Sequence, residues 1–282
     1  MTETGGQLQG KVALVTGAVR KPGIGRSTIQ RLAAMGAAVV CCDQVGSDED
    51  AARDTAVVPA SLLQGLVDEL TAGGTLAVAV DMDIADRASV ERGVNRAVME
   101  FGRLDICCHL GGGTSPERDL PLMELDDDAW DVTTARILTS VFLVDRAAAA
   151  QMIRQGDGGA IVNLGSFAAV RLGPGPPAFS TAKAGAEALT KLFARELAPH
   201  AIRVNMVHPL GVNPEGEAGN NPGLARAAAQ AGRSVDDWMR DMIPLGRFQT
   251  PDETAAVIAF LCTPDASFTS GQAISVAGAA TP

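Results

Sequence analysis

The stretch TGAVRKPGIG, residues 16–25, joins two segments of different periodicity and decides the fold class. Before it, residues 11–16 (KVALVT) form a short apolar, β-branched run that predicts a buried strand. After it, residues 24–35 carry apolar side chains at helical spacing and end at Gly36, which predicts a helix. Glycines in a strand–turn–helix unit let the backbone turn sharply and approach a pyrophosphate at the helix N-terminus. The stretch therefore predicts a dinucleotide-binding turn.

The alternation of strands and helices continues to the end of the chain. Further expected strands are residues 37–42, 75–80, 104–109, 160–164, 202–207 and 273–276. Further expected helices are residues 61–70, 90–101, 127–154, 178–197 and 254–261. The apolar runs are continuous, as in parallel strands that are covered on both faces. The sequence thus predicts one α/β domain over residues 1–282, a doubly wound Rossmann-type parallel sheet of about seven strands with helices on both faces.

Two stretches depart from this regular spacing. Residues 46–60 form an acidic, polar insertion after the second expected strand. Residues 210–240 are rich in glycine, proline and asparagine and then turn helical. Loops of this length in a compact domain are commonly binding loops or lids. We expect residues 210–240 to be an insertion that covers the substrate.

Composition excludes several classes of protein. Of the 282 residues, 46% are hydrophobic and 20% charged, which argues against disorder, and no apolar run reaches the roughly 18 residues of a membrane span. The net charge of −10 argues against nucleic acid or an anionic membrane as a partner. The N-terminus lacks the apolar region of a signal peptide, and the five cysteines fit a reduced cytoplasm. The chain contains no tyrosine, so no mechanism can use a phenolic general acid. The cysteines, read as core residues, are Cys41, Cys42, Cys107, Cys108 and Cys262.

An acidic residue ends the second expected strand. Asp43 follows Gly25 by 43 − 25 = 18 residues, which is the place of the acid that hydrogen-bonds an adenosine ribose. Because a carboxylate repels a 2′-phosphate, Asp43 favours NAD(H) over NADP(H) as cofactor. Arg20 and Lys21 in the glycine turn are basic and could instead reach a phosphate, or they form a solvated turn.

Beyond the glycine turn, several segments resemble those of the short-chain dehydrogenase/reductase family. They are residues 83–86 (DIAD), 104–112 (LDICCHLGG), 161–166 (IVNLGS), 179–183 (FSTAK), 202–209 (IRVNMVHP), 244–247 (PLGR) and 269–272 (TSGQ). The resemblance covers nearly the whole chain and implies a nicotinamide cofactor and a small-molecule substrate. The cofactor-binding residues that it implies are Gly17, Gly23, Ile24, Gly25, Asp43, Asp83, Ile84, His109, Gly111, Lys183 and Val212.

The same resemblance implies an atypical catalytic site. In this family a serine, a tyrosine, a lysine and an asparagine share the chemistry, and the serine lies 13 residues before the tyrosine. Here 179 − 166 = 13, so Ser166 and Lys183 are retained while Phe179 stands at the tyrosine position. Ile137 stands where the asparagine that holds a relay water is expected. A phenylalanine cannot supply the rate gain of about 10²–10⁴-fold that a positioned general acid gives.

Other polar or altered positions surround the expected site. Leu210 replaces the glycine of the family's Pro-Gly turn, and Pro214 stands where a threonine often meets the nicotinamide carboxamide. His109 occupies the place of a structural asparagine and could be catalytic or structural. His208 is expected to pack behind the cofactor and His200 to lie on the surface. The sequence shows no cluster with metal-ligand spacing.

Three functions remain open from the sequence. The first, which needs the fewest assumptions, is an NAD(H)-dependent oxidoreductase with a non-standard acid/base site, acting on a small carbonyl, alcohol or conjugated C=C substrate. The second is a catalytically silent subunit of a hetero-oligomer, paired with an active member of the family. The third is a non-redox lyase or isomerase on the same scaffold. The resemblance also implies a homodimer or homotetramer assembled through the helices expected at residues 127–154 and 178–197.

Overall fold

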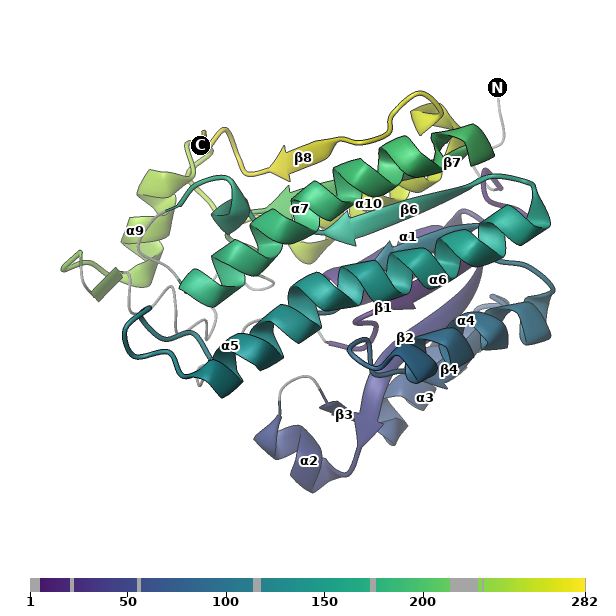
Figure 1. Ribbon diagram of the computed structural model, residues 1–282, viewed down its shortest axis with the longest axis horizontal. Helices are drawn as coiled ribbons and strands as arrows, with labels where there is room; N and C mark the ends of the chain where they lie inside the picture. Colours follow the sequence, from purple (N-terminus) through teal and green to yellow (C-terminus); the bar gives the residue numbers. More distant parts are fainter. Residues whose placement is uncertain are drawn as a thin grey trace.

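An eight-stranded parallel sheet forms the centre of the computed structural model, which describes residues 6–20, 23–54, 57–113, 118–172, 176–213, 228–229 and 231–281. The strand order is β3–β2–β1–β5–β6–β7–β8, with β4 also paired to β2 (Figure 1). The strands are β1 (Val12–Thr16), β2 (Ala38–Gly46), β3 (Val57–Pro59), β4 (Ala77–Asp81), β5 (Ile106–His109), β6 (Gly159–Leu164), β7 (Ile202–Pro209) and β8 (Ala273–Val276).

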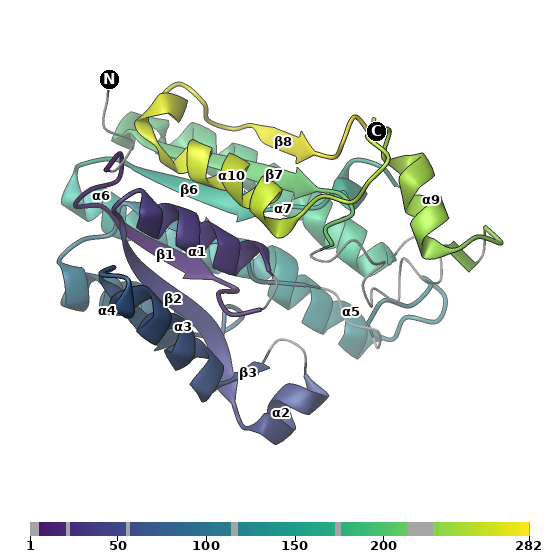
Figure 2. The same cartoon turned by 180° about the vertical axis from the view of Figure 1, so that it is seen from behind.

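The helices form a layer on each face of this sheet (Figures 1 and 2). One layer contains α1 (Ile24–Ala34), α3 (Ala60–Ala72) and α10 (Pro251–Cys262), whose buried side chains share one core cluster. The other contains α4 (Arg87–Phe101), α6 (Ser140–Gln155) and α7 (Pro177–Leu197), which bury apolar side chains in a second cluster. Successive residues of a strand point to opposite faces, so the adjacent cysteines divide between the two cores. This doubly wound arrangement confirms the predicted fold class.

The strand order reverses between β1 and β5. The strand β1 pairs with β2 on one side and with β5 on the other. In open α/β sheets, ligands bind in the crevice outside the carboxyl ends of the strands at such a reversal. The glycine turn follows β1 directly and therefore lies at this crevice.

The insertion at residues 46–60 contains regular structure that its polar sequence did not predict. Ser47 caps α2 (Asp48–Arg53) through a reciprocal pair of hydrogen bonds with Asp50. The three residues of β3 then pair with Gln44–Gly46 at the end of β2, beyond the part of β2 that pairs with β4. A strand of three residues is too short to show an alternating pattern in its sequence. The formation of β3 therefore depends on its pairing with the longer β2.

The helix expected over residues 127–154 is present but is not uniform. It consists of α5 (Asp127–Thr134), the π-helical segment η1 (Ala135–Thr139) and α6. The remaining elements are η2 (Phe167–Ala169), η3 (Ala198–His200), α9 (Val235–Met242) and η4 (Pro264–Ala266). Residues 214–227 and 230, about half of the predicted lid and including Pro214, lie outside the described residues. Within the described ranges, none of the helices combines the length and the apolar character that crossing a membrane requires.

Candidate active site

The glycine turn after β1 presents bare backbone at the start of α1. Gly17 has a φ of +71°, a left-handed conformation that glycine adopts without strain. A Cβ on Gly25 would overlap the carbonyl oxygen of Gly17, and one on Gly23 would lie 2.6 Å from the carbonyl oxygen of Arg20. Gly23 is also the N-cap of α1 and brings no side chain to it. Free N–H groups at a helix N-terminus attract phosphate, so this turn fits a pyrophosphate.

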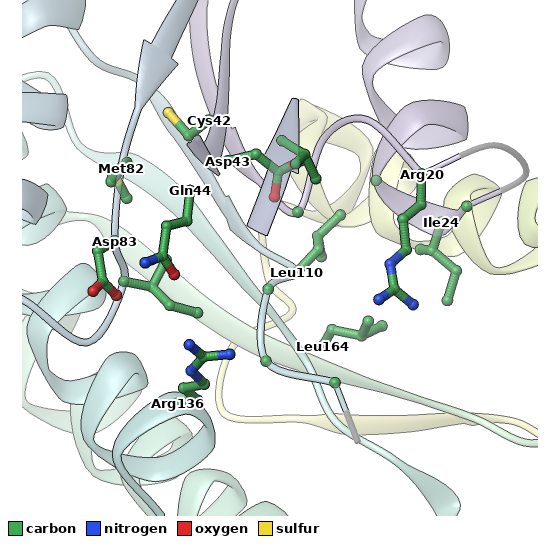
Figure 3. Close-up of a pocket in the computed structure, with 18 of the residues that line it drawn as sticks. Arg20, Ile24, Cys42, Asp43, Gln44, Met82, Asp83, Leu110, Arg136 and Leu164 are labelled. Carbon is green, nitrogen blue, oxygen red and sulfur yellow. The ribbon is translucent and has the colours of Figure 1, made fainter. Parts of the chain in front are cut away.

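A pocket of about 280 Å³ opens at the carboxyl ends of β1, β2, β4 and β5 (Figure 3). The structure brings most of the predicted cofactor-binding residues together in its lining: Gly17, Gly23, Ile24, Gly25, Asp43, Asp83, Ile84 and Gly111. Leu164, the last residue of β6, also lines it. His109, Lys183 and Val212 were predicted to bind the cofactor but are not part of this lining, and Val212 forms an isolated bridge with Gln249.

Asp43 has a structural contact that the sequence did not reveal. Its Oδ2 accepts a hydrogen bond from the backbone N–H of Val19 at 2.9 Å, which ties the glycine turn to the end of β2. Burial raises the pKa of Asp43 to about 6, although the N–H groups of Val19 and Ala18 and the charge of Arg20 act to lower it. The carboxyl group thus both lines the pocket and holds the turn in place.

The insertion at residues 46–60 borders the same pocket. Val58 of β3 lines it, and so does Arg136 of η1, which lies beside Gln44 and Asp83 in Figure 3. Arg136 donates to both carboxylate oxygens of Asp54, at 2.9 and 2.6 Å, and so joins the end of α2 to η1. The sequence did not predict that these residues line the pocket. The unexplained length of the insertion at residues 46–60 was the one feature that could have indicated it.

Beyond Leu164 lie the predicted catalytic residues. Ser166 follows β6 after one glycine, and its Oγ accepts a hydrogen bond from the N–H of Ala168 at 3.2 Å. Lys183 of α7 is buried, and its Nζ donates to the carbonyl oxygen of Leu164 at 2.7 Å. The same Nζ lies 5.7 Å from the ring centroid of Phe179, and burial lowers the pKa of Lys183 to about 8. Lys183 is therefore anchored where the pocket meets the Ser166 turn.

His109 belongs to a buried chain of hydrogen bonds. Thr16 Oγ1 accepts from the N–H groups of Leu110 and Gly111, so its own hydrogen is donated to His109 Nδ1, at 2.9 Å. His109 Nε2 then donates to Ser140 Oγ at 3.0 Å, and Ser140 donates to a carbonyl oxygen of η1 at 2.7 Å. Burial, helped by the charge of Lys183, lowers the pKa of His109 to about 3. The ring is neutral and joins β1, β5 and the start of α6, which favours the structural interpretation.

His200 and the cysteines lie as expected, whereas His208 does not line the pocket. His208 is buried and accepts a hydrogen bond from the N–H of Ser166, and His200 is exposed in η3, just after α7. All five cysteines are buried and free, in agreement with their interpretation as core residues. Within the described part of the chain, no group of three or more His, Cys, Asp or Glu side chains could hold a metal ion.

Comparison with known proteins establishes the family. A family model described as enoyl-(acyl carrier protein) reductase matches residues 17–281. A 3-oxoacyl-[acyl-carrier-protein] reductase of Thermotoga maritima is 34% identical over 96% of this chain and 98% of its own. A cyclohexanol dehydrogenase of a Rhodococcus species is 34% identical, with 97% of each chain covered.

Solved structures agree with these relatives. A short-chain dehydrogenase/reductase of Serratia marcescens has a TM-score of 0.79 and 31% identity, covering 98% of this chain and all of its own. A blue fluorescent protein from a metagenomic library, in complex with NADPH, has a TM-score of 0.80 and 28% identity over the same shares. The chain belongs to the short-chain dehydrogenase/reductase superfamily, as its motifs predicted. The relatives matched by sequence are named as oxidoreductases.

Proposed function

We propose that the protein is an NAD(H)-dependent oxidoreductase in which Ser166 and Lys183, without a tyrosine, act on the substrate oxygen. The observation that supports this most directly is the retention of Lys183. It is buried, bonded to Leu164 at the end of the cofactor pocket, and close to the Phe179 ring. A lysine is costly to bury unless the site uses its charge.

The residues of the pocket suit a nicotinamide dinucleotide. The backbone of the glycine turn would hold the pyrophosphate, and Asp43, Asp83 and Ile84 would contact the adenosine. When bound, the nicotinamide gives a hydride to the substrate carbon or takes one from it. We propose NAD(H) as the cofactor because the Asp43 carboxylate would repel a 2′-phosphate. The NADPH bound by one structural relative makes NADP(H) the alternative that has to be tested.

The protein's own groups can stabilise negative charge on a substrate oxygen. Ser166 Oγ accepts one N–H and keeps its own hydrogen to donate. Lys183 adds a positive charge in a dry environment, where electrostatic stabilisation is strong. An enolate oxygen, formed when a conjugated C=C accepts a hydride, needs less proton donation than an alkoxide. We therefore propose conjugated C=C compounds as the preferred substrates, ahead of simple carbonyls and alcohols, with residues 210–240 covering them.

Cofactor titration and a substrate screen test this proposal. We expect calorimetry to give tighter binding of NADH than of NADPH, and enones to oxidise NADH when the enzyme is present. Lys183→Met should remove at least about 99% of that turnover. Absence of binding to both cofactors, or turnover that Lys183→Met leaves unchanged, would contradict the proposal.

A silent subunit of a hetero-oligomer is the second candidate, because Phe179 and the buried Ile137 leave two of the family's four catalytic positions without a polar group. That function predicts co-purification with a relative whose four positions are intact. A non-redox lyase or isomerase would instead show turnover of a substrate without added nicotinamide.

We further propose a cytoplasmic location, which suits the five free cysteines.

A further inference from the structure

His208 of β7 contacts the backbone of the Ser166 turn directly. Its side chain is 1% exposed, and its Nδ1 accepts a hydrogen bond from the N–H of Ser166 at 2.9 Å. A backbone N–H can only donate, so Nδ1 must carry the lone pair and Nε2 the proton. Nε2 lies 2.9 Å from Oε2 of Glu187 and therefore donates to it. Both ring nitrogens are satisfied, and the ring is neutral in one defined tautomer.

The turn is shaped to admit this ring. A Cβ on Gly165 would overlap His208 Nδ1, so position 165 tolerates no side chain while the histidine is in place. The N–H of Gly165 donates to the carbonyl oxygen of Val207 at 2.8 Å. Two successive residues of the turn are thus bonded to two successive residues of β7, first through backbone and then through the His208 side chain. The direction in which Ser166 leaves β6 depends on both bonds.

Glu187 connects this pair to the helix that carries the other catalytic residues. It lies on α7, four residues and one helical turn after Lys183. Its Oε1 accepts from Lys191 at 2.5 Å, which leaves Oε2 for His208. Helix α7 consequently holds the end of β6 at two points. Lys183 binds the carbonyl oxygen of Leu164, and Glu187 reaches the N–H of Ser166 through the imidazole.

We propose that His208 and Glu187 are positioning residues that hold Ser166 in register with Lys183 for reaction at the substrate oxygen. This inference rests on the proposed function, because it assigns the pair to the same site. Neither residue is part of the pocket lining, and the hydrogen bonds of the pair reach the site through the backbone of Ser166. A displacement of about 1 Å at a reacting group can cost roughly a hundredfold in rate. A buried, doubly bonded histidine under the serine prevents such a displacement.

The proposal predicts a distinctive acid limb in the pH dependence of turnover. Burial lowers the pKa of His208, although the hydrogen bond and charge of Glu187 act to raise it, and Lys183 and Lys191 add to the lowering. Burial also acts on Glu187, but its hydrogen bonds from Lys191 and His208 keep the pKa of that carboxyl below its ordinary value. If His208 were protonated at Nδ1, the new ring N–H would point toward the backbone N–H of Ser166, and the hydrogen bond between them would be lost. Turnover should therefore fall at acid pH as His208 becomes charged.

Two substitutions at position 208 separate positioning from packing. Asparagine places an Oδ1 acceptor close to the position of Nδ1 but does not titrate, so His208→Asn should keep turnover within a few fold and lose the acid limb. Leucine fills similar space without an acceptor, so His208→Leu should lower kcat about ten- to a hundredfold and leave the Kd of NADH unchanged. Glu187→Gln keeps an acceptor for Nε2–H and should be milder than Glu187→Ala. The exposed His200→Leu is the matched control.

A readout that needs no substrate accompanies the kinetics. In protein labelled with ¹⁵N-serine, the amide signal of Ser166 should titrate with His208, keep its position in His208→Asn and move in His208→Leu. Equal losses of kcat in the Asn and Leu variants, or a Ser166 amide that none of these changes affects, would overturn the positioning role. If the unaltered enzyme turns over no substrate, the proposed function fails, and the amide signal alone then supports or overturns the positioning of Ser166.

Discussion

The side chain at position 179 limits the proton chemistry of this site. Phe179 stands at the family's tyrosine position, with its ring centroid 5.7 Å from Lys183 Nζ. We expect Phe179→Tyr to raise ketone reduction about 10²–10⁴-fold, because the phenol could then give a proton that Lys183 helps to stabilise. Steady-state kinetics with ketones and enones would measure the gain, and Phe179→Tyr combined with Lys183→Met is the control. No gain at unchanged NADH affinity would mean that position 179 does not face the substrate.

The titration of Lys183 should appear in the rates. Burial lowers the pKa of this lysine to about 8, so the ammonium form is present below that pH and is lost above it. If the charge stabilises a developing oxyanion, kcat/KM for reduction should be highest below about pH 8 and fall about tenfold per pH unit above it. A pH profile from about pH 6 to pH 10 tests this, with Lys11→Met, at the amino end of β1 and opposite the pocket, as control. A flat profile over that range would remove Lys183 from the chemistry.

Asp145 on α6 should make the protein less stable as the pH rises. Its side chain is fully buried, and burial raises the pKa to about 7 although Asn163 donates a hydrogen bond at 2.7 Å. Because the folded pKa lies above the unfolded value, the stability from this group is complete below about pH 4 and is lost as the pH rises from there to about 7. Asp145→Asn should therefore stabilise the protein by roughly 2–4 kcal/mol at pH 8 and by less, about 1–2 kcal/mol, at pH 5.

Urea unfolding of both proteins at the two pH values measures this difference. Oδ1 of Asp145 and Oδ1 of Asn163 have no hydrogen-bond partner among the described residues. Asparagine at position 145 adds an N–H donor to this pair of side chains. Asp131→Asn, on the exposed side of α5, is the matched control and should change little. A stabilisation by Asp145→Asn that is the same at pH 5 and pH 8 would show that ionisation of this carboxyl is not its cause.

For individual residues, spacing along the chain predicted only those site residues that are close together in the sequence. Ser166, Phe179 and Lys183 follow from one interval on the chain, because a strand, a turn and a helix keep their spacing. The contacts of His208 join residues 21 and 42 positions apart, and those of Arg136 and Asp54 join residues 82 positions apart. No local pattern encodes such pairs, since they depend on how the sheet and helices pack.

At the scale of elements, the π-helical segment between α5 and α6 is stabilised by a side chain. Ser140 donates to the carbonyl oxygen of Arg136 and accepts from Nε2 of His109. We expect Ser140→Ala to cost about 1–3 kcal/mol of unfolding free energy, because it leaves a buried ring N–H and a helix carbonyl without their partner. Thr134→Ala is the control, because Thr134 is partly exposed and bonds only within its own helical turn. Equal effects of the two changes in chemical denaturation would contradict this role of Ser140.

The elements also show where sequence patterns are and are not sufficient. The long strands and amphipathic helices were predicted because burial on one or both faces imposes a period on them. The π-helical segment was not predicted, because five residues inside a long helical stretch are too short to show a period of their own. The short α2 and β3 were missed because a capping box in an acidic run and three residues of strand carry little periodic signal. Of these elements, β3 and η1 line the pocket, through Val58 and Arg136.

At the scale of the whole molecule, the surface combines a net charge of −10 with apolar side chains on α5 and α6. Two copies repel each other by charge, so association has to come from apolar contact. Both helices lie next to α7 (Figure 1). The large apolar side chains that they partly expose are Trp130, Val132, Phe142 and Ile153. We expect a homodimer or homotetramer that forms through α5 and α6.

Light scattering should therefore give two or four times the 29.0 kDa of one chain. Phe142→Glu should lower this mass toward that of a single chain. A two-fold axis brings the new carboxylates to equivalent places on both subunits, where each would lose water and the apolar contact of the ring, with only Arg146, 5.0 Å from that ring, as a partner. Leu76→Glu removes another large apolar side chain, 66% exposed just before β4, and should leave the mass unchanged. A single-chain mass before any substitution would refute the assembly, whereas a mass that Phe142→Glu does not alter would move the contact to another face.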